Sequence, residues 1–133
     1  MAPAALAPRG YNGPMVLVAV DDLLFSSKIR ATAKNVGVEV TFARTPADIL
    51  AQARSLKPAL VIFDINCAKA DPINTVAALK ADPELNGIPT AGFVSHVDTA
   101  LIAAARAAGI DEVMARSAFA ANLPQILSRR SSS

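Results

Sequence analysis

The chain has 133 residues, of which 53% are hydrophobic and 18% are charged, and its formal net charge at pH 7 is +2. This length fits one domain with a sizeable core, and no apolar stretch reaches the roughly 18–20 residues that a membrane span needs. The charge is small and the basic residues are scattered without interleaved aromatics, so nothing indicates a nucleic-acid surface. The single cysteine, Cys67, excludes an internal disulfide and a multi-cysteine metal site, which makes a reducing, cytoplasmic setting the expectation.

The two ends of the chain differ in composition from the rest. Residues 1–14 are rich in alanine and proline and lack the basic start and long apolar core of a signal peptide, so we expect a flexible arm there. Residues 129–133 are arginine and serine, which leaves nothing to bury, and we expect a disordered tail. A single domain is therefore predicted over residues 15–128.

Strand-like apolar runs alternate with segments of helical spacing along this domain. The expected strands are Met15–Val20, Val38–Phe42, Leu60–Asp64, Ile88–Val94 and Ile110–Ala115. The expected helices begin after Asp22, at Thr45-Pro46, at Asn74, at Thr99 and near Phe119. Pro124 either makes the first half of the last helix irregular or moves its start to about Asn122. Five strands that alternate with helices predict an α/β fold, with a parallel sheet covered by helices on both faces.

The candidate functional residues all follow directly after predicted strands. Leu60 to Asp64 is a continuous apolar run that ends on a carboxylate, which is typical of a strand buried on both faces. Its aspartate falls at the carboxyl end of the strand, where open α/β sheets bind their ligands. The other candidates at this edge are Asp21, Asp22, Asn66, Ser95 and Arg116.

The chemistry of these residue types favours a metal-assisted phosphoryl site. Carboxylates that lie close together repel one another unless a cation joins them. Mg²⁺ is a natural partner because it binds through one or two carboxylates, retained waters and a phosphoryl oxygen. A hydroxyl at Ser95 and a positive charge at Arg116 would complete a cradle for a small anion over Asp64.

In order and rough spacing, Asp21-Asp22, Asp64, Ser95 and Arg116 resemble the motif of a response-regulator receiver domain of the chemotaxis-regulator (CheY-like) type. The resemblance covers about Met15 to Leu127. It implies a single three-layer (βα)5 flavodoxin/CheY-like domain whose five-stranded parallel sheet has the order 2-1-3-4-5.

The resemblance also implies a role for each residue of the motif. Asp64 would accept a phosphoryl group from a kinase phosphohistidine, and Ser95 would be the switch hydroxyl. Arg116 stands where the family has a phosphate-contacting lysine. The implied Mg²⁺ ligands are Asp21, Asp22, Asp64 and the backbone carbonyl of Asn66.

The implied function is that of a stand-alone receiver in a two-component phosphorelay and not that of an enzyme. Its partners would be a sensor histidine kinase or phosphotransfer protein and a downstream protein, with neither nucleic acid nor membrane involved. Three departures favour an alternative, a phosphorylation-independent pseudo-receiver used as an interaction module. They are Arg116-Ser117 in place of Lys-Pro, Val113 in place of an aromatic residue, and an unusual loop over residues 66–72.

Other interpretations rest on single features. His96 is expected to be an exposed loop histidine and Cys67 an inert thiol. The alanine-rich helix from Thr99 has two open interpretations, either simple helix propensity or a contact face for a partner or a second copy of the chain. A dinucleotide-binding enzyme is disfavoured, because no glycine-rich turn follows the first strand.

Overall fold

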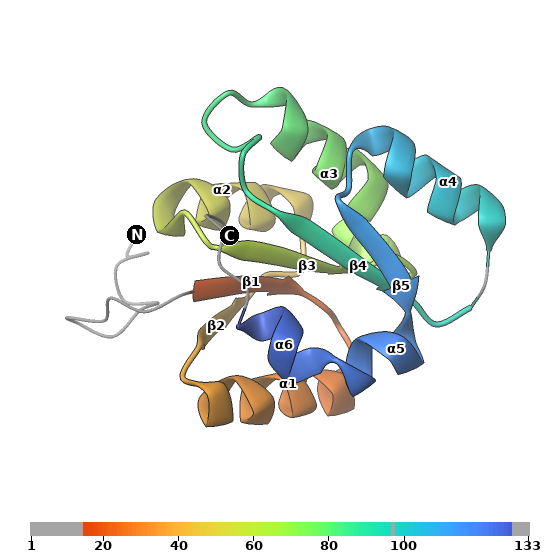
Figure 1. Ribbon diagram of the computed structural model, residues 1–133. Coiled ribbons are helices and arrows are strands. Elements are labelled where there is room, and N and C mark those ends of the chain that lie inside the picture. The colour runs from red at the N-terminus through yellow and green to blue at the C-terminus, as the bar shows by residue number, and fades with distance from the viewer. Residues whose placement is uncertain (1–14, 97, 129–133) are drawn as a thin grey trace.

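A computed structural model describes residues 15–96 and 98–128 of the chain. Its five strands form one parallel sheet in the order β2-β1-β3-β4-β5 (Figure 1). The strands are β1 (Met15–Ala19), β2 (Glu39–Phe42), β3 (Leu60–Asp64), β4 (Thr90–Val94) and β5 (Glu112–Ala115). The predicted fold class and strand order are confirmed.

Helices cover both faces of this sheet. The helices are α1 (Leu23–Val36), α2 (Pro46–Leu56), the 3-10 helix η2 (Ala68–Ala70), α3 (Pro72–Ala81), α4 (Thr99–Ala108), α5 (Arg116–Ala121) and α6 (Leu123–Leu127). In Figure 1, α1, α5 and α6 lie on one side of the sheet and α2, α3 and α4 on the other. None of the helices in the described residues has the length and apolar content that a membrane span requires.

Local signals in the sequence explain where the first two helices begin and end. Asp22 caps α1, because its Oδ1 accepts the backbone N–H groups of Leu24 and Phe25 at 2.9 and 3.1 Å. Gly37 ends the helix in the left-handed conformation with φ 73°. Thr45 caps α2 in the same way, and Pro46 follows it at the start of the helix.

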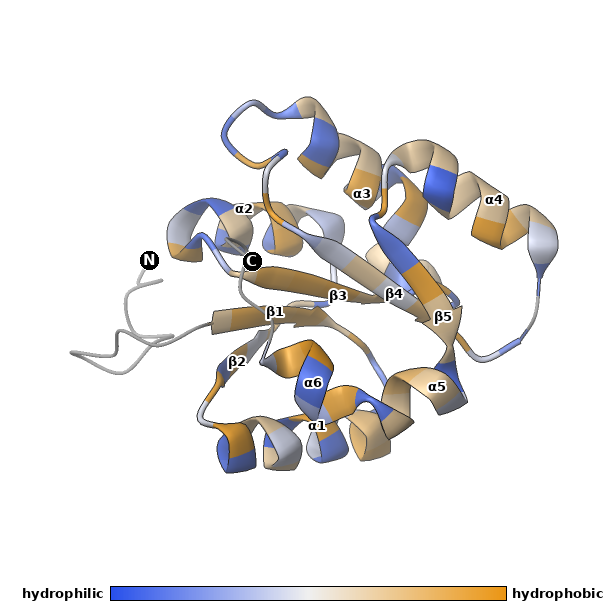
Figure 2. Cartoon of the chain, in the orientation of Figure 1, coloured by the Kyte–Doolittle hydropathy of each residue, from blue (hydrophilic) through white to orange (hydrophobic). Residues whose placement is uncertain are grey.

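The core consists of two apolar layers, one on each face of the sheet. Alternate residues of β1 and β3 point to opposite faces, so Val16 and Ile62 pack toward α1 and α6 while Leu17 and Phe63 pack toward α2 and α3. In Figure 2, the visible parts of β1 and β3 carry the hydrophobic colours. This burial on both faces is what the continuous apolar run before Asp64 predicted.

The C-terminal part of the domain differs from the simplest expectation. In place of one helix, the structure has α5 and α6, which are separated by Asn122. Pro124 lies in the first turn of α6, where its missing N–H is not needed. The bounds of β3 are those predicted, whereas β1 ends one residue earlier and β2, β4 and β5 begin one or two residues later than predicted. The helix η2 was not predicted. The predicted arm (1–14) and tail (129–133) lie outside the described residues.

Gly92 in the middle of β4 is required by packing. A methyl group at this position would lie 2.6 Å from Cδ1 of Ile65 and 2.9 Å from Cδ1 of Ile110. No side chain fits there unless these isoleucines move. A glycine that looks like a weakness in the sequence of a strand therefore permits close packing over β4.

We predict that Gly92→Ala destabilises the fold by about 1–3 kcal/mol, because overpacking forces side chains out of their rotamers. Gly87→Ala is the matched control, since nothing lies within 4 Å of the added methyl group. This variant should change stability by less than about 1 kcal/mol. Urea denaturation of both variants measures the difference, and equal midpoints would refute the packing explanation.

Candidate functional site

The carboxyl ends of the three central strands bring the predicted site residues to one edge of the sheet. Asp64 is the last residue of β3 and lies opposite Phe93 of β4, while Ala19 of β1 lies opposite Phe63. The loops that follow β1 and β4 therefore flank Asp64 on its two sides. Arg116 approaches the same edge from the end of β5.

Asp64 is a half-buried carboxylate with one oxygen held in place. Its Oδ1 accepts the backbone N–H of Asn66 at 3.0 Å, and no hydrogen bond to Oδ2 is found in the described part of the chain. Burial raises the pKa of Asp64 above its usual value, and the nearby Asp22 carboxylate raises it further. The Asn66 N–H and the positive charge of Arg116 oppose this rise but do not cancel it.

Asp22 and Arg116 form an ion pair across the site. Nη2 of Arg116 donates to Oδ2 of Asp22 at 2.8 Å, which joins the start of α5 to the cap of α1. This hydrogen bond is the main reason that the pKa of Asp22 lies below its usual value. The guanidinium also lies over the Phe25 ring, 4.4 Å from its centroid.

Asp21 points to a different pair of cations. Its Oδ1 lies 3.4 Å from Nε of Arg44, and its Oδ2 lies 3.6 Å from Nζ of Lys69. Arg44 follows β2 and Lys69 belongs to η2, so Asp21 links three loops of the same edge. The sequence predicted the position of Asp21 at this edge but not its partners.

Asn66 and Ser95 connect the loops after β3 and β4. Oδ1 of Asn66 accepts the backbone N–H of Ser95 at 2.7 Å, so the side chain of Asn66 is engaged in this link. The hydroxyl of Ser95 accepts a long hydrogen bond of 3.4 Å from Nη1 of Arg116. Asp64, Asn66, Ser95 and Arg116 are thus brought together as the strand-end pattern predicted.

The predicted metal ligands have suitable chemistry, because carboxylate and carbonyl oxygens are the donors that Mg²⁺ prefers. Their arrangement, however, is not that of a ready metal site. Within residues 15–96 and 98–128, no group of three acidic, thiol or imidazole side chains lies close enough to hold a metal ion. Both oxygens of Asp22 already accept hydrogen bonds, and Oδ2 lies 2.8 Å from the positively charged guanidinium of Arg116, which would repel a metal ion at this oxygen.

The fold matches many solved structures, although the sequence matches none of the known family models and no curated protein. A response regulator from Hahella chejuensis is 23% identical with a TM-score of 0.79, over 87% of this chain and 93% of that one. The receiver domain of a Pseudomonas aeruginosa sensor histidine kinase, solved with magnesium in its active-site cleft, is 18% identical with a TM-score of 0.79. It covers 92% of this chain and 100% of that domain. A phosphorylated cyanobacterial phytochrome response regulator is 22% identical with a TM-score of 0.74, over 88% and 90% of the two chains.

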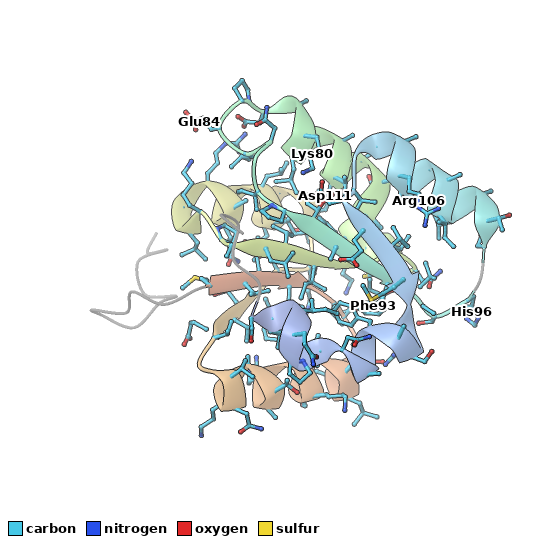
Figure 3. The ribbon with its side chains drawn as sticks, in the orientation of Figure 1. Lys80, Glu84, Phe93, His96, Arg106 and Asp111 are labelled. Carbon is cyan, nitrogen blue, oxygen red and sulfur yellow. The ribbon has the colours of Figure 1, made fainter. Side chains whose placement is uncertain are left out.

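The chain has the fold of response-regulator receiver domains. The family resemblance that the sequence motif indicated is thereby confirmed at the level of the fold. In this receiver fold, the carboxyl edge of the sheet carries Asp64 and its neighbours, and His96 is an exposed loop residue beside that edge, as predicted (Figure 3).

Sequence reasoning missed two of the cations at the site, Arg44 and Lys69. The rule that found the other candidates also applies to Arg44, because it lies two residues beyond the end of β2. Lys69 gave no such signal, since its position depends on the path of the loop after Asp64. The opposite edge of the sheet holds a polar cluster that was also missed, in which Asp111 accepts hydrogen bonds from Lys80 and Thr90 (Figure 3).

The raised pKa of Asp64 has a consequence for stability. A carboxyl with a higher pKa in the folded state than in the unfolded state destabilises the fold once it ionises. The free energy of unfolding therefore falls as the pH rises through the folded pKa. Below the unfolded value of 3.8 the group is protonated in both states, and the cost disappears. The ionised Asp64 thus destabilises the receiver fold at neutral pH.

We therefore expect Asp64→Asn to raise Tm by a few degrees at pH 7, with a gain that shrinks toward zero below pH 3.8. Asp82→Asn is the opposite control, because the Glu84 N–H and Arg54 lower the pKa of Asp82. That variant should lose stability at pH 7. Thermal denaturation at both pH values checks the two signs, and a lower Tm for Asp64→Asn at pH 7 would contradict the assignment.

Proposed function

We propose that the chain is a signalling receiver that accepts a phosphoryl group on Asp64 and acts through a partner protein. The observation that carries this proposal is the position of Asp64, which ends β3 with Oδ1 held by the Asn66 N–H and Oδ2 not engaged by a described residue. Ser95 and Arg116 lie beside it and supply the hydroxyl and the positive charge that a phosphoryl group needs.

The transfer step can be written for these residues. An Asp64 carboxylate oxygen attacks the phosphorus of a partner's phosphohistidine, so that a P–O bond forms and the P–N bond breaks. The imidazole nitrogen keeps the electron pair of the broken bond and takes up a proton. The guanidinium of Arg116 stabilises the charge on the phosphoryl oxygens, and the Ser95 hydroxyl donates a hydrogen bond to one of them.

Divalent metal belongs to the same proposal. Asp21, Asp22, Asp64 and the backbone carbonyl of Asn66 are the residues that would hold Mg²⁺. When bound, Mg²⁺ would neutralise charge on the phosphoryl oxygens. The solved receiver domain with magnesium in its cleft and the phosphorylated phytochrome regulator support this assignment by analogy of fold.

A second candidate function is favoured by the ion pairs of the site. Asp22 is bonded to Arg116 at 2.8 Å, and Asp21 faces Arg44 and Lys69, so the carboxylates are balanced by the chain's own cations. A domain of this kind could serve as a phosphorylation-independent interaction module. The face that α4 presents, with Ala103 and Ala107 exposed, is a candidate contact surface in either case.

Acetyl phosphate with Mg²⁺ separates the two functions. We expect the wild-type chain to gain one phosphoryl group, which adds about 80 Da by intact mass spectrometry, and Asp64→Asn to gain none, because the nucleophilic oxygen is lost. Asp71→Asn is the matched control, since Asp71 lies in the same loop and its carboxylate accepts hydrogen bonds from the side-chain amide of Asn74. This variant should keep the adduct.

If no adduct forms on the wild-type chain with acetyl phosphate or phosphoramidate, the interaction module is the better account. An adduct that survives in Asp64→Asn would place the acceptor elsewhere and contradict the proposal.

A further inference from the structure

The three carboxylates of the site face three cations of the same chain. Arg44 and Lys69 lie beside Asp21, and Arg116 lies beside Asp22. Asp64 adds the third negative charge, within electrostatic reach of Asp22 and Arg116. The site is therefore close to neutral before any metal ion arrives, and the repulsion that would favour a divalent ion is partly relieved, although Asp22 still raises the pKa of Asp64.

Arg116 is the most firmly held of these cations. It bonds to Asp22 at 2.8 Å, reaches Ser95 at 3.4 Å and lies over the Phe25 ring at 4.4 Å. Its side chain is 35% exposed, compared with 55% for Arg44 and 56% for Lys69. The planar guanidinium can make these contacts at once, because it stacks with one face and donates hydrogen bonds from its rim.

The rings beneath Arg116 belong to the core. The Phe25 centroid lies 5.0 Å from that of Phe93, and the Phe93 centroid lies 4.9 Å from that of Phe119. Phe119 comes from α5, the helix that Arg116 begins. The position of Arg116 is thus fixed by packing as well as by charge.

Both oxygens of Asp22 accept hydrogen bonds while this pair is intact. Oδ1 accepts the two N–H groups at the start of α1, and Oδ2 accepts Nη2 of Arg116. The cap bonds stabilise the helix and are costly to give up. Oδ2 is therefore the oxygen that a metal would use, and a metal ion there would be repelled by the positive guanidinium of Arg116, which lies 2.8 Å from this oxygen.

We propose that Arg116 is a built-in counter-ion for Asp22 that competes with divalent metal, so that metal binding requires the Arg116–Asp22 pair to open. This proposal rests on the proposed function, because it concerns the same acidic edge. The metal affinity of the chain is then limited by its own arginine. Opening of the pair releases the guanidinium from Asp22 and leaves it available to a phosphoryl group on Asp64.

Mg²⁺ binding to the metal-free chain tests this competition. Isothermal titration calorimetry at about 0.15 M salt, where charges more than about 8 Å apart are screened, gives the affinity without any phosphoryl donor. We expect Arg116→Gln to bind Mg²⁺ at least about tenfold more tightly than the wild-type chain, the range that loss of one charge-assisted hydrogen bond predicts. Arg116→Lys should lie between the two, because a lysine ammonium keeps the charge but loses the planar stacking and the second donor.

Arg30→Gln is the matched control. Arg30 is also an arginine over a phenylalanine ring, 4.7 Å from the centroid of Phe42, but it lies two turns along α1 from the cap. The Arg30→Gln substitution changes the net charge by the same amount as Arg116→Gln. It should leave the Mg²⁺ affinity within about twofold of wild type, because salt screens the charge of Arg30 at its distance from the site.

The proposal is overturned if Arg116→Gln binds Mg²⁺ no more tightly than the wild-type chain, which includes the case in which neither binds, or if Arg30→Gln gains as much. Circular dichroism confirms that each variant is folded, and Arg116→Lys carries the test if Arg116→Gln is not. The acetyl phosphate experiment tests the proposed function independently of this competition. A tighter metal site without an adduct leaves this inference standing and removes the proposed function, whereas an adduct without tighter binding does the reverse.

Discussion

The parallel pairing of β3 with β1 on one side and with β4 on the other is the constraint on which the site depends. Each pairing fixes a register, Phe63 opposite Ala19 and Asp64 opposite Phe93, and so fixes which loops flank Asp64. Helices cover these strands on both faces, so a shift of register by one residue would move each core side chain into the opposite core layer, where it does not fit. The rigidity of the central strands is what holds polar groups from distant parts of the chain at one edge.

Charge at this edge is balanced mainly inside the protein. Two aspartates after β1 each face at least one basic side chain, while Asp64 remains half-buried with a raised pKa. Within the described residues, Asp64 is held by one backbone N–H and costs stability when ionised, and this combination is typical of a functional residue. The two carboxylates of the site therefore differ: the negative charge of Asp22 is balanced by Arg116, whereas that of Asp64 is balanced less well.

The cap of α1 links this chemistry to the fold. Asp22 stabilises the first turn of the helix with one oxygen and binds Arg116 with the other. Arg116 in turn lies on the aromatic cluster that joins α1, β4 and α5. A change in the partner of Asp22 would therefore alter contacts at the start of both α1 and α5. These contacts connect the site directly to the face of the domain on which α1 and α5 lie.

By itself, the sequence determined the alternation of strands and helices, the burial of Leu60–Phe63 and the edge at which Asp21, Asp22, Asp64, Ser95 and Arg116 meet. These features follow from local periodicity, capping residues and the rule that strand ends share an edge, all of which act over short stretches of chain. The caps at Asp22 and Thr45 and the break near Pro124 could be predicted for the same reason.

Only the tertiary structure decided which charges pair. The sequence placed a cation at residue 116, but its partner Asp22 lies 94 positions away, so the pairing depends on the path of the chain between them and on the rings beneath the guanidinium. Lys69 reaches Asp21 because of the loop path through η2, which has no clear sequence signal. Ion-pair partners depend on distances of a few ångströms between separate loops, and patterns along the chain do not contain that information.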